Sequence, residues 1–304
     1  MPIKLIGGNA HRPLNAALAH ELGVSVEQVE IASFADGETR VHVGADVRDA
    51  AVIIVQPTCH PVNDNVMVLA LLTDAARAAG AARVIAVTPY FGYARQDQRS
   101  RDGDPRSAQV VAKLLASVGL DHLIVLDLHT PALESAFPMS VSLLSPEELF
   151  LPRLRRWDLR NPVIVSPDAG GLKRAQRLAL ALEARLAVIA KARPGPDIAA
   201  PLQALGEVKN CPCVIVDDMA STGRTLAGAA QALRGAGASE VSAVFTHAVM
   251  APDAIDRLSA AAFAKVMTTD SIPLAGNSWF EVVPIAPLLA RAVRSLCGEL
   301  PQAP

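Results

Sequence analysis

The chain has 304 residues, a length that accommodates two ordinary domains, each with a core of its own. Hydrophobic residues make up 51% of it, which predicts a folded protein rather than a disordered one. The formal net charge is −2 and no run of Lys and Arg occurs, which argues against nucleic acids and anionic membranes as partners. With no signal-peptide pattern and no apolar run long enough to cross a bilayer, we expect a cytoplasmic protein.

Strand-like and helical patterns alternate along the chain. In order, we predict strands at 3–6, 40–43, 51–55, 84–87, 123–126, 163–165, 187–189, 214–216, 241–245 and 265–267, and helices at 14–22, 65–79, 109–118, 172–182, 225–236, 254–260 and 284–297. This alternation predicts an α/β fold with two similar, mostly parallel sheets flanked by helices. We place the domains at 1–143 and 144–284, with 285–304 a helix that packs back on the first.

The most informative stretch is V-I-V-D-D-M-A-S-T-G-R-T, residues 214–225. It reads as a buried strand, a short loop and the start of a helix. The loop offers hydroxyls, backbone N–H groups and a helix N-terminus to an anion, while the adjacent carboxylates can meet ribose hydroxyls or hydrated Mg²⁺. The string therefore predicts a sugar-phosphate site, whose candidate residues are Asp217, Asp218, Ser221, Thr222, Gly223, Arg224 and Thr225.

The same residue types also occur in ordinary α/β crossovers. In that alternative, Asp218 is a turn residue, Ser221 is the N-cap of the helix and Gly223 is a turn glycine. Any one of these residues fits either interpretation, and the sugar-phosphate hypothesis rests on the whole string.

Further polar clusters follow or precede predicted strands. They comprise Phe34, Asp36, Gly37 and Glu38; Arg95, Gln96 and Asp97; His129; Asp168; and Lys191 with Arg193. Each has an ordinary alternative: an Asp-Gly β-turn, a core aromatic ring, a solvated loop, a hydrogen-bonded histidine, or a linker with incidental cations.

Five strings in this order resemble the ribose-phosphate pyrophosphokinase family over nearly the whole chain. They are F-A-D-G-E, P-Y-F-G-Y-A-R-Q-D, D-L-H, S-P-D-A-G-G and V-D-D-M-A-S-T-G-R-T. The resemblance implies an enzyme that makes phosphoribosyl pyrophosphate and AMP from ATP and ribose 5-phosphate. It implies a first domain that contributes to the ATP site and a second domain that binds ribose 5-phosphate. It also implies a homo-oligomer built from dimers, as a hexamer or a tetramer.

The resemblance also implies roles for the clusters. ATP would be bound by Phe34, Asp36, Gly37, Glu38, Arg95, Gln96 and Asp97; Mg²⁺ would be held by His129 and Asp168; and ribose 5-phosphate would contact Arg193 and the residues from Asp217 to Thr225 named above. Lys191 and Arg193 match a Lys-x-Arg that stabilises the transferring group.

The chain departs from the family pattern at several places. Leu133 replaces a usual Gln, Ser221 replaces an Asp common in bacterial members, and Arg224 replaces a small residue. Residues 100–109 also differ from the usual bacterial pattern, and the chain has no aromatic-bearing tail after L-P-Q-A-P. Because both regions help form regulatory sites between subunits in many bacterial members, the resemblance does not carry over regulation by phosphate and ADP. Two alternatives stay open: a phosphoribosyltransferase, which would share residues 214–225, and a catalytically silent regulatory paralogue.

Overall fold

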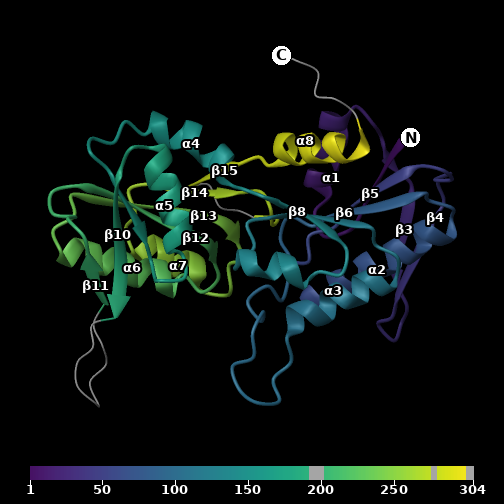
Figure 1. Cartoon of the computed structure of the whole chain (residues 1–304), viewed down its shortest axis with the longest axis horizontal. Coiled ribbons are helices and arrows are strands. Elements are labelled where there is room, and N and C mark those ends of the chain that lie inside the picture. The colour runs from purple at the N-terminus through teal and green to yellow at the C-terminus, as the bar shows by residue number, and fades with distance from the viewer. Residues whose placement is uncertain (192–201, 275–278, 299–304) are drawn as a thin grey trace. The chain divides into compact units, whose positions relative to one another are not determined.

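The computed structural model describes residues 1–191, 202–274 and 279–298 (Figure 1). The chain divides into two compact units. Unit 1 comprises Met1–Ser145, Ser271–Pro273 and Pro284–Pro304, and unit 2 comprises Pro146–Asp270 and Leu274–Val283.

Unit 1 is built on a parallel sheet in the order β2-β1-β5-β6-β7-β8. Its strands are β1 (Ile3–Gly7), β2 (Val26–Glu27), β5 (Ala51–Val55), β6 (Arg83–Val87), β7 (His122–Leu126) and β8 (Ser140–Leu144). All residues of β5 and β7 are buried, because both faces of the sheet are covered by helices.

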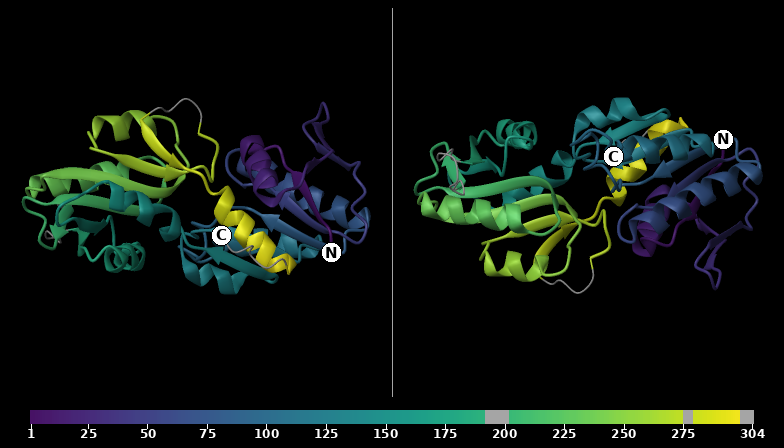
Figure 2. Two further views of the ribbon diagram at one scale, coloured as in Figure 1. Left: turned by 90° about the horizontal axis from the view of Figure 1, so that it is seen from above. Right: turned by 90° about the horizontal axis from the view of Figure 1, so that it is seen from below.

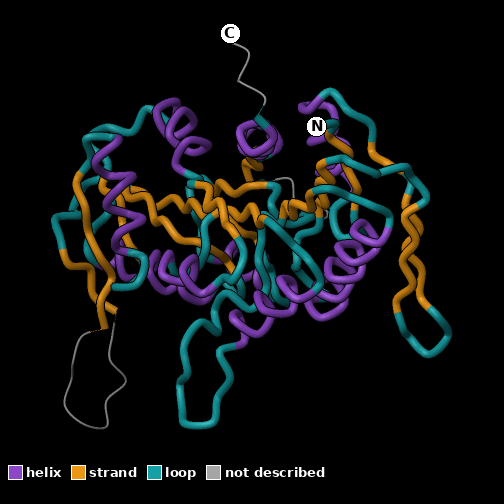
Figure 3. The backbone as a smooth tube through the Cα atoms, turned by 45° about the vertical axis from the view of Figure 1, so that its right-hand side comes forward, coloured by secondary structure: helices purple, strands orange, loops and turns teal. Residues whose placement is uncertain are grey.

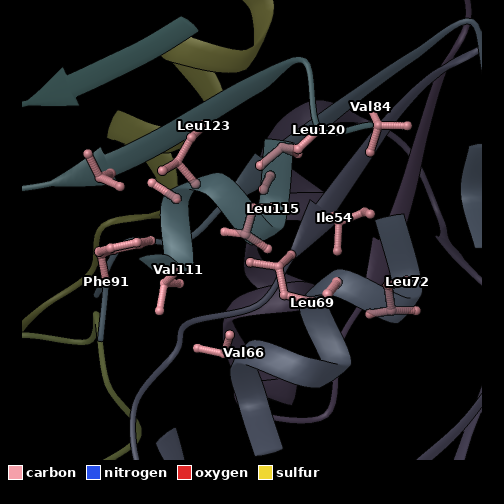
Figure 4. Close-up of a cluster of buried hydrophobic side chains, with 14 of the residues drawn as sticks. Ile54, Val66, Leu69, Leu72, Val84, Phe91, Val111, Leu115, Leu120 and Leu123 are labelled. Atoms are coloured by element: carbon pink, nitrogen blue, oxygen red, sulfur yellow. The ribbon is translucent and has the colours of Figure 1, made fainter. Parts of the chain in front are cut away.

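The helices of unit 1 lie on opposite faces of the sheet, as Figures 1 and 2 show. One face carries α1 (Arg12–Leu22) and α8 (Ala286–Cys297), and the other carries α2 (Val62–Ala78) and α3 (Ser107–Ser117), with a 3-10 turn η1 (Pro131–Ala136) nearby. The core between the sheet and the second face includes Leu69 of α2 and Leu115 of α3, packed as in Figure 4. Helix α8 contacts α1, and Arg294 donates to the carbonyl of Glu21 at 2.5 Å.

A separate antiparallel hairpin extends from unit 1 (Figure 3). Its strands are β3 (Val29–Ser33) and β4 (Thr39–Val43), and β4 packs beside α2. The predicted strand at 40–43 is confirmed, but the prediction that it belongs to the parallel sheet is wrong. It pairs with β3 instead of joining the parallel sheet.

Unit 2 has a sheet in the order β11-β10-β9-β12-β13-β14-β15, parallel except for the edge strand β11. Its strands are β9 (Val163–Ser166), β10 (Arg185–Lys191), β11 (Leu202–Leu205), β12 (Pro212–Ala220), β13 (Glu240–Ala248), β14 (Val266–Thr269) and β15 (Phe280–Val283). One face packs on α4 (Glu147–Arg156) and α5 (Leu172–Ala181), and the other on α6 (Arg224–Gly235) and α7 (Ala254–Ala260).

The predicted α/β class with mostly parallel sheets is confirmed, while several element boundaries were wrong. Strand β12 does not end before the acidic pair: it continues to Ala220, because β13 keeps pairing with it as far as Ala248. Helix α4 was missed, and it contains Pro152, which is unusual inside a helix. Within the described ranges, no helix combines the length and the hydropathy required to span a membrane.

Candidate active site

The carboxyl end of β12 in unit 2 carries two adjacent carboxyl groups. Asp217 is half-buried and Asp218 is only 3% exposed. The Oδ1 atom of Asp217 accepts a hydrogen bond from the backbone N–H of Asp218 at 2.9 Å. Burial, and next the charge of Asp218, raise the pKa of Asp217 well above its ordinary value. Such a pair is rich in hydrogen-bond acceptors, so it is suited to a ligand that brings several hydroxyl donors.

The loop after β12 leads directly into the N-terminus of α6. The N-cap residue of α6 is Gly223, in a left-handed conformation with φ 70°. A Cβ at this position would lie 3.1 Å from Leu258 Cγ and 3.2 Å from the carbonyl oxygen of Ala254. Both the backbone angle and the space therefore favour glycine. Because Gly223 has no side chain to cap the helix, the N-terminus of α6 is available to an anion.

Hydrogen bonds from the segment that follows β13 hold the backbone of this loop. The carbonyls of Ala220 and Ser221 accept hydrogen bonds from the N–H groups of Met250 and Ala251 at 3.0 and 2.9 Å. The guanidinium of Arg257 donates to the carbonyl of Thr222. Ser221 is therefore held by backbone contacts and is not the N-cap that the ordinary crossover requires.

The outward-facing residues of the loop supply hydroxyls and a cation. Thr222, Arg224 and Thr225 are exposed, and the N–H of Arg224 lies 3.4 Å from Thr222 Oγ1. The candidate residues of the sugar-phosphate string therefore share one strand end and one helix start, as the sequence predicts. Arg257 belongs to the same arrangement, and no local sequence signal identified it.

Asp168 lies in the tight turn between β9 and α5. Its Oδ1 atom accepts a hydrogen bond from the N–H of Gly171 at 2.9 Å, and its carbonyl accepts one from Ser166 Oγ at 2.6 Å. The residue is exposed. The turn thus presents a carboxylate at a fixed position next to the carboxyl end of β9, which is the strand paired with β12.

In unit 1, the segment after β6 forms a buried elbow followed by an exposed loop. Gly92 donates to Thr58 Oγ1 at 2.6 Å, and a Cβ on Gly92 would lie 2.5 Å from the carbonyl oxygen of Thr58. Arg95 and Gln96 follow at the surface, and Gln96 Oε1 accepts a hydrogen bond from Ser107 Oγ of α3 at 2.7 Å. The tight elbow projects the loop that carries these residues and leads to α3 (Figure 1).

Asp97 borders an open pocket of about 450 Å³ in unit 1. Two cationic side chains, Arg99 and Arg106, line the same pocket. Leu133, one of the departures from the family pattern, lines it as well and is 3% exposed. The pocket is therefore polar and cationic on the side of the loop and apolar at Leu133.

The residues from Phe34 to Glu38 form the turn of the β3–β4 hairpin. Asp36 Oδ1 accepts a hydrogen bond from the N–H of Glu38 at 3.1 Å, and Gly37 has φ 93°. Phe34 is 51% exposed, so it is not a core residue. Figures 1 and 3 show this turn and the loop between β6 and α3 as two separate projections of unit 1. The described chain does not bring these two clusters together.

The two predicted metal ligands belong to different units. His129 is exposed and follows β7, two residues after the buried Asp127, whose backbone is left-handed with φ 46°. Asp168 belongs to unit 2. Within the described residues, no group of three or more His, Cys, Asp and Glu side chains could hold a metal ion.

Lys191 is the last residue of β10, where its backbone pairs with Leu202 of β11. Arg193 lies outside the described residues. The predicted roles of both residues remain predictions.

Comparisons with known proteins identify the family. Residues 3–119 match the model of the N-terminal domain of ribose phosphate pyrophosphokinase, and residues 149–269 match that of the phosphoribosyl transferase domain. A ribose-phosphate pyrophosphokinase of Haemophilus influenzae is 40% identical over 98% of this chain and 96% of its own length. The chain belongs to the ribose-phosphate pyrophosphokinase family.

Other relatives agree with this assignment. A ribose-phosphate pyrophosphokinase of Vibrio parahaemolyticus is 39% identical over 98% of this chain and 96% of its own length. The crystal structure of phosphoribosylpyrophosphate synthetase from Mycobacterium smegmatis has a TM-score of 0.91 and 33% identity, and the match covers 99% of this chain and all of the other. The predicted enzyme class, a ribose-phosphate diphosphokinase of nucleotide biosynthesis, is confirmed.

Proposed function

We propose that the carboxyl end of β12 and the start of α6 hold ribose 5-phosphate during the pyrophosphokinase reaction. The observation that carries this is the carboxylate pair Asp217–Asp218 next to an uncapped helix N-terminus. Ribose hydroxyls donate to the carboxylates, and the 5-phosphate accepts hydrogen bonds from residues 221–225 and α6. Arg224, which is exposed in the first turn, adds a positive charge beside the phosphate.

ATP is the second substrate in this proposal. Arg95 supplies a planar guanidinium for phosphate oxygens, while Gln96 and Asp97 extend the polar surface of the same loop. Phe34, with Asp36 and Glu38, offers a ring for stacking and carboxylates for the adenine amino group or the ribose. Gly37 allows the left-handed turn that presents these residues.

Mg²⁺ accompanies the nucleotide in this proposal, with His129 and Asp168 as its protein ligands. Asp168 is the chemically stronger candidate, because Mg²⁺ prefers oxygen ligands and Asp168 is exposed on a turn that hydrogen bonds fix. When bound, Mg²⁺ neutralises phosphate charge and polarises the phosphoryl oxygens.

Lys191 and Arg193 stabilise the charge that develops during transfer. The C1 hydroxyl oxygen of ribose 5-phosphate forms a bond to the β-phosphorus of ATP as the bond from that phosphorus to the AMP oxygen breaks. Negative charge then grows on the β-phosphoryl oxygens and on the leaving oxygen, and cations from the chain after β10 oppose it. Arg193 also contacts ribose 5-phosphate in this proposal.

The separation of the ATP candidates within unit 1 supports a homo-oligomer. One nucleotide bound at the loop between β6 and α3 does not also meet the turn of the β3–β4 hairpin of the same unit, because the two segments project from separate places (Figure 3). We expect that the hairpin of a second copy completes the ATP site. Mixing inactive Asp36→Ala and Arg95→Ala proteins should then restore activity in hybrid assemblies, whereas a hairpin that acts only within its own chain would restore none.

The reaction is tested by AMP formation from ATP and ribose 5-phosphate with purified protein and no nucleobase. Activity under these conditions excludes a phosphoribosyltransferase and a silent paralogue together. Asp218→Asn should raise KM for ribose 5-phosphate at least tenfold, since a charged hydrogen bond contributes about 1.5–3 kcal/mol. Unchanged KM in this variant would show that the pentose binds elsewhere.

A further inference from the structure

Beyond the loop and the carboxylates, one buried cation belongs to the same edge of unit 2. Arg174 lies in the first turn of α5 and is only 9% exposed. Both features are unfavourable, because burial removes water from the guanidinium and the positive end of the helix dipole repels a cation. A buried Arg at this position therefore needs anionic neighbours.

The first such neighbour is the turn that carries Asp168. A Cβ built on Gly171 would lie 3.0 Å from Ser166 Oγ, 3.7 Å from Asp168 Oδ1 and 3.8 Å from Arg174 Nη1, so these three atoms surround the space that Gly171 leaves open. Helix α5 also packs against β9 and β12.

The second neighbour is the acidic pair on β12. Burial and the charge of Asp218 raise the pKa of Asp217, and the positive charge of Arg174 acts in the opposite direction. Helix α5, which carries Arg174, packs against β12, which carries the pair. The positive charge of Arg174 therefore offsets part of the cost of placing a half-buried and a buried carboxyl group side by side.

We propose that Arg174 is a positioning residue for the pentose site, where its guanidinium lies between the turn that carries Asp168 and the Asp217–Asp218 pair and fixes the direction of the carboxylates. This rests on the proposed function, in which the pair receives the ribose hydroxyls. Arg174 does not contact the pentose itself. It holds the acceptors in the geometry that hydroxyl donors require and joins the two acidic elements of unit 2 into one rigid edge.

The test compares Arg174→Met with Arg177→Met in the full chain. Arg177 is on the same helix but is exposed and paired with Glu147 at 2.7 Å, so it serves as a matched control. We expect Arg174→Met to raise KM for ribose 5-phosphate at least tenfold while KM for ATP changes less than threefold. Arg177→Met should leave both values as in the wild type. Arg174→Lys, which keeps the charge without the planar fork, should recover part of the loss.

An equal rise in both KM values, or a lower Tm with unchanged KM for ribose 5-phosphate, would overturn the role of Arg174. If Arg174→Met does not yield folded protein, Arg174→Lys decides. A severalfold rise in KM for the pentose alone supports the role, and an unchanged KM overturns it. Asp217→Asn, measured in parallel, distinguishes failure of the proposed pentose site from failure of the role of Arg174. An unchanged KM for ribose 5-phosphate in Asp217→Asn would contradict the proposed pentose site. A raised KM in Asp217→Asn without one in Arg174→Met removes only the role of Arg174.

Discussion

Units 1 and 2 share an architecture but display their polar residues in different ways. In unit 2, residues 221–223 join β12 to α6, and the acidic pair and the helix N-terminus lie within a few residues of them. In unit 1, residues 88–106 separate β6 from α3, and the polar side chains are exposed on that long loop and on a hairpin. Hydrogen bonds hold the backbone of the short connection in unit 2. The long connection in unit 1 instead leaves its polar side chains exposed at the surface.

The largest expected effect is on kcat and concerns Lys191, the last residue of β10 in unit 2. Replacing Lys191 by Ala should lower kcat by a factor of about 10² to 10³, since one such charge contact contributes roughly 3–4 kcal/mol to the transition state. Neither KM should change by a comparable factor, because the charge that Lys191 opposes develops only during transfer. Steady-state kinetics with both substrates provides the measurement, and a nearly normal kcat would remove Lys191 from the proposed chemistry.

The effect of the acidic pair on the free energy of unfolding can be measured at Asp217. Its pKa is raised in the folded protein, so the folded state holds a proton more tightly than the unfolded chain does, and stability falls as pH rises through the raised pKa. Asp217→Asn should therefore increase the free energy of unfolding at neutral pH by about 1 to 2 kcal/mol while weakening pentose binding. Urea denaturation at pH 7.5 and at pH 5 checks this: the gain should shrink at the lower pH, and a constant gain would contradict the assignment.

Gly223 tests how closely the short loop is packed. Gly223→Ala should cost about 1 to 2 kcal/mol for the left-handed backbone, and more for the contacts with Ala254 and Leu258. Gly23, the C-cap of α1, has nearly the same φ of 71° and nothing within 4 Å of a Cβ, so Gly23→Ala isolates the backbone contribution. Equal losses in the two variants would mean that packing around Gly223 is loose.

The smallest predicted effect lies in unit 1, at His122. This side chain is 6% exposed, and its Nε2 lies 2.8 Å from Ser142 Oγ. Burial, and then the charge of Arg83, lower its pKa, so the unfolded chain takes up a proton first as pH falls. Between pH 7 and pH 5 His122 should cost about 1 kcal/mol of stability. His122→Asn should flatten this decline, whereas replacing the exposed His42 should not.

The sequence contained most of the fold, because apolar runs and helical periodicity are local signals. Strands such as β5 and β7, which are buried throughout, were predicted almost residue by residue. The end of β12 was not predicted, since Asp217 and Asp218 look like turn residues and only pairing with β13 keeps them in a strand. The β3–β4 hairpin was missed for a similar reason: its pairing is antiparallel and outside the main sheet.

The residues of the proposed pentose site could be grouped from the sequence because they are contiguous in one strand–loop–helix unit. Arg174 and Arg257 were not, because their neighbours are distant in sequence or in other elements. Arg174 reads as one of several cations on α5, and only its burial distinguishes it from Arg177. Arg257 acts on the carbonyl of Thr222, 35 residues away, which no local pattern reports.

The return of α8 to unit 1 has a consequence for synthesis. Leu288, Leu289 and Val293 of α8 are buried, and Arg83 donates to the carbonyl of Leu296 at 2.7 Å. Unit 1, most of whose residues are synthesised first, therefore lacks the helix that covers α1 until α8 has been made. Unit 2 can finish folding earlier, although its residues are made later. A chain that stops at residue 284 would contain all of unit 2, including β15, but would lack α8 of unit 1.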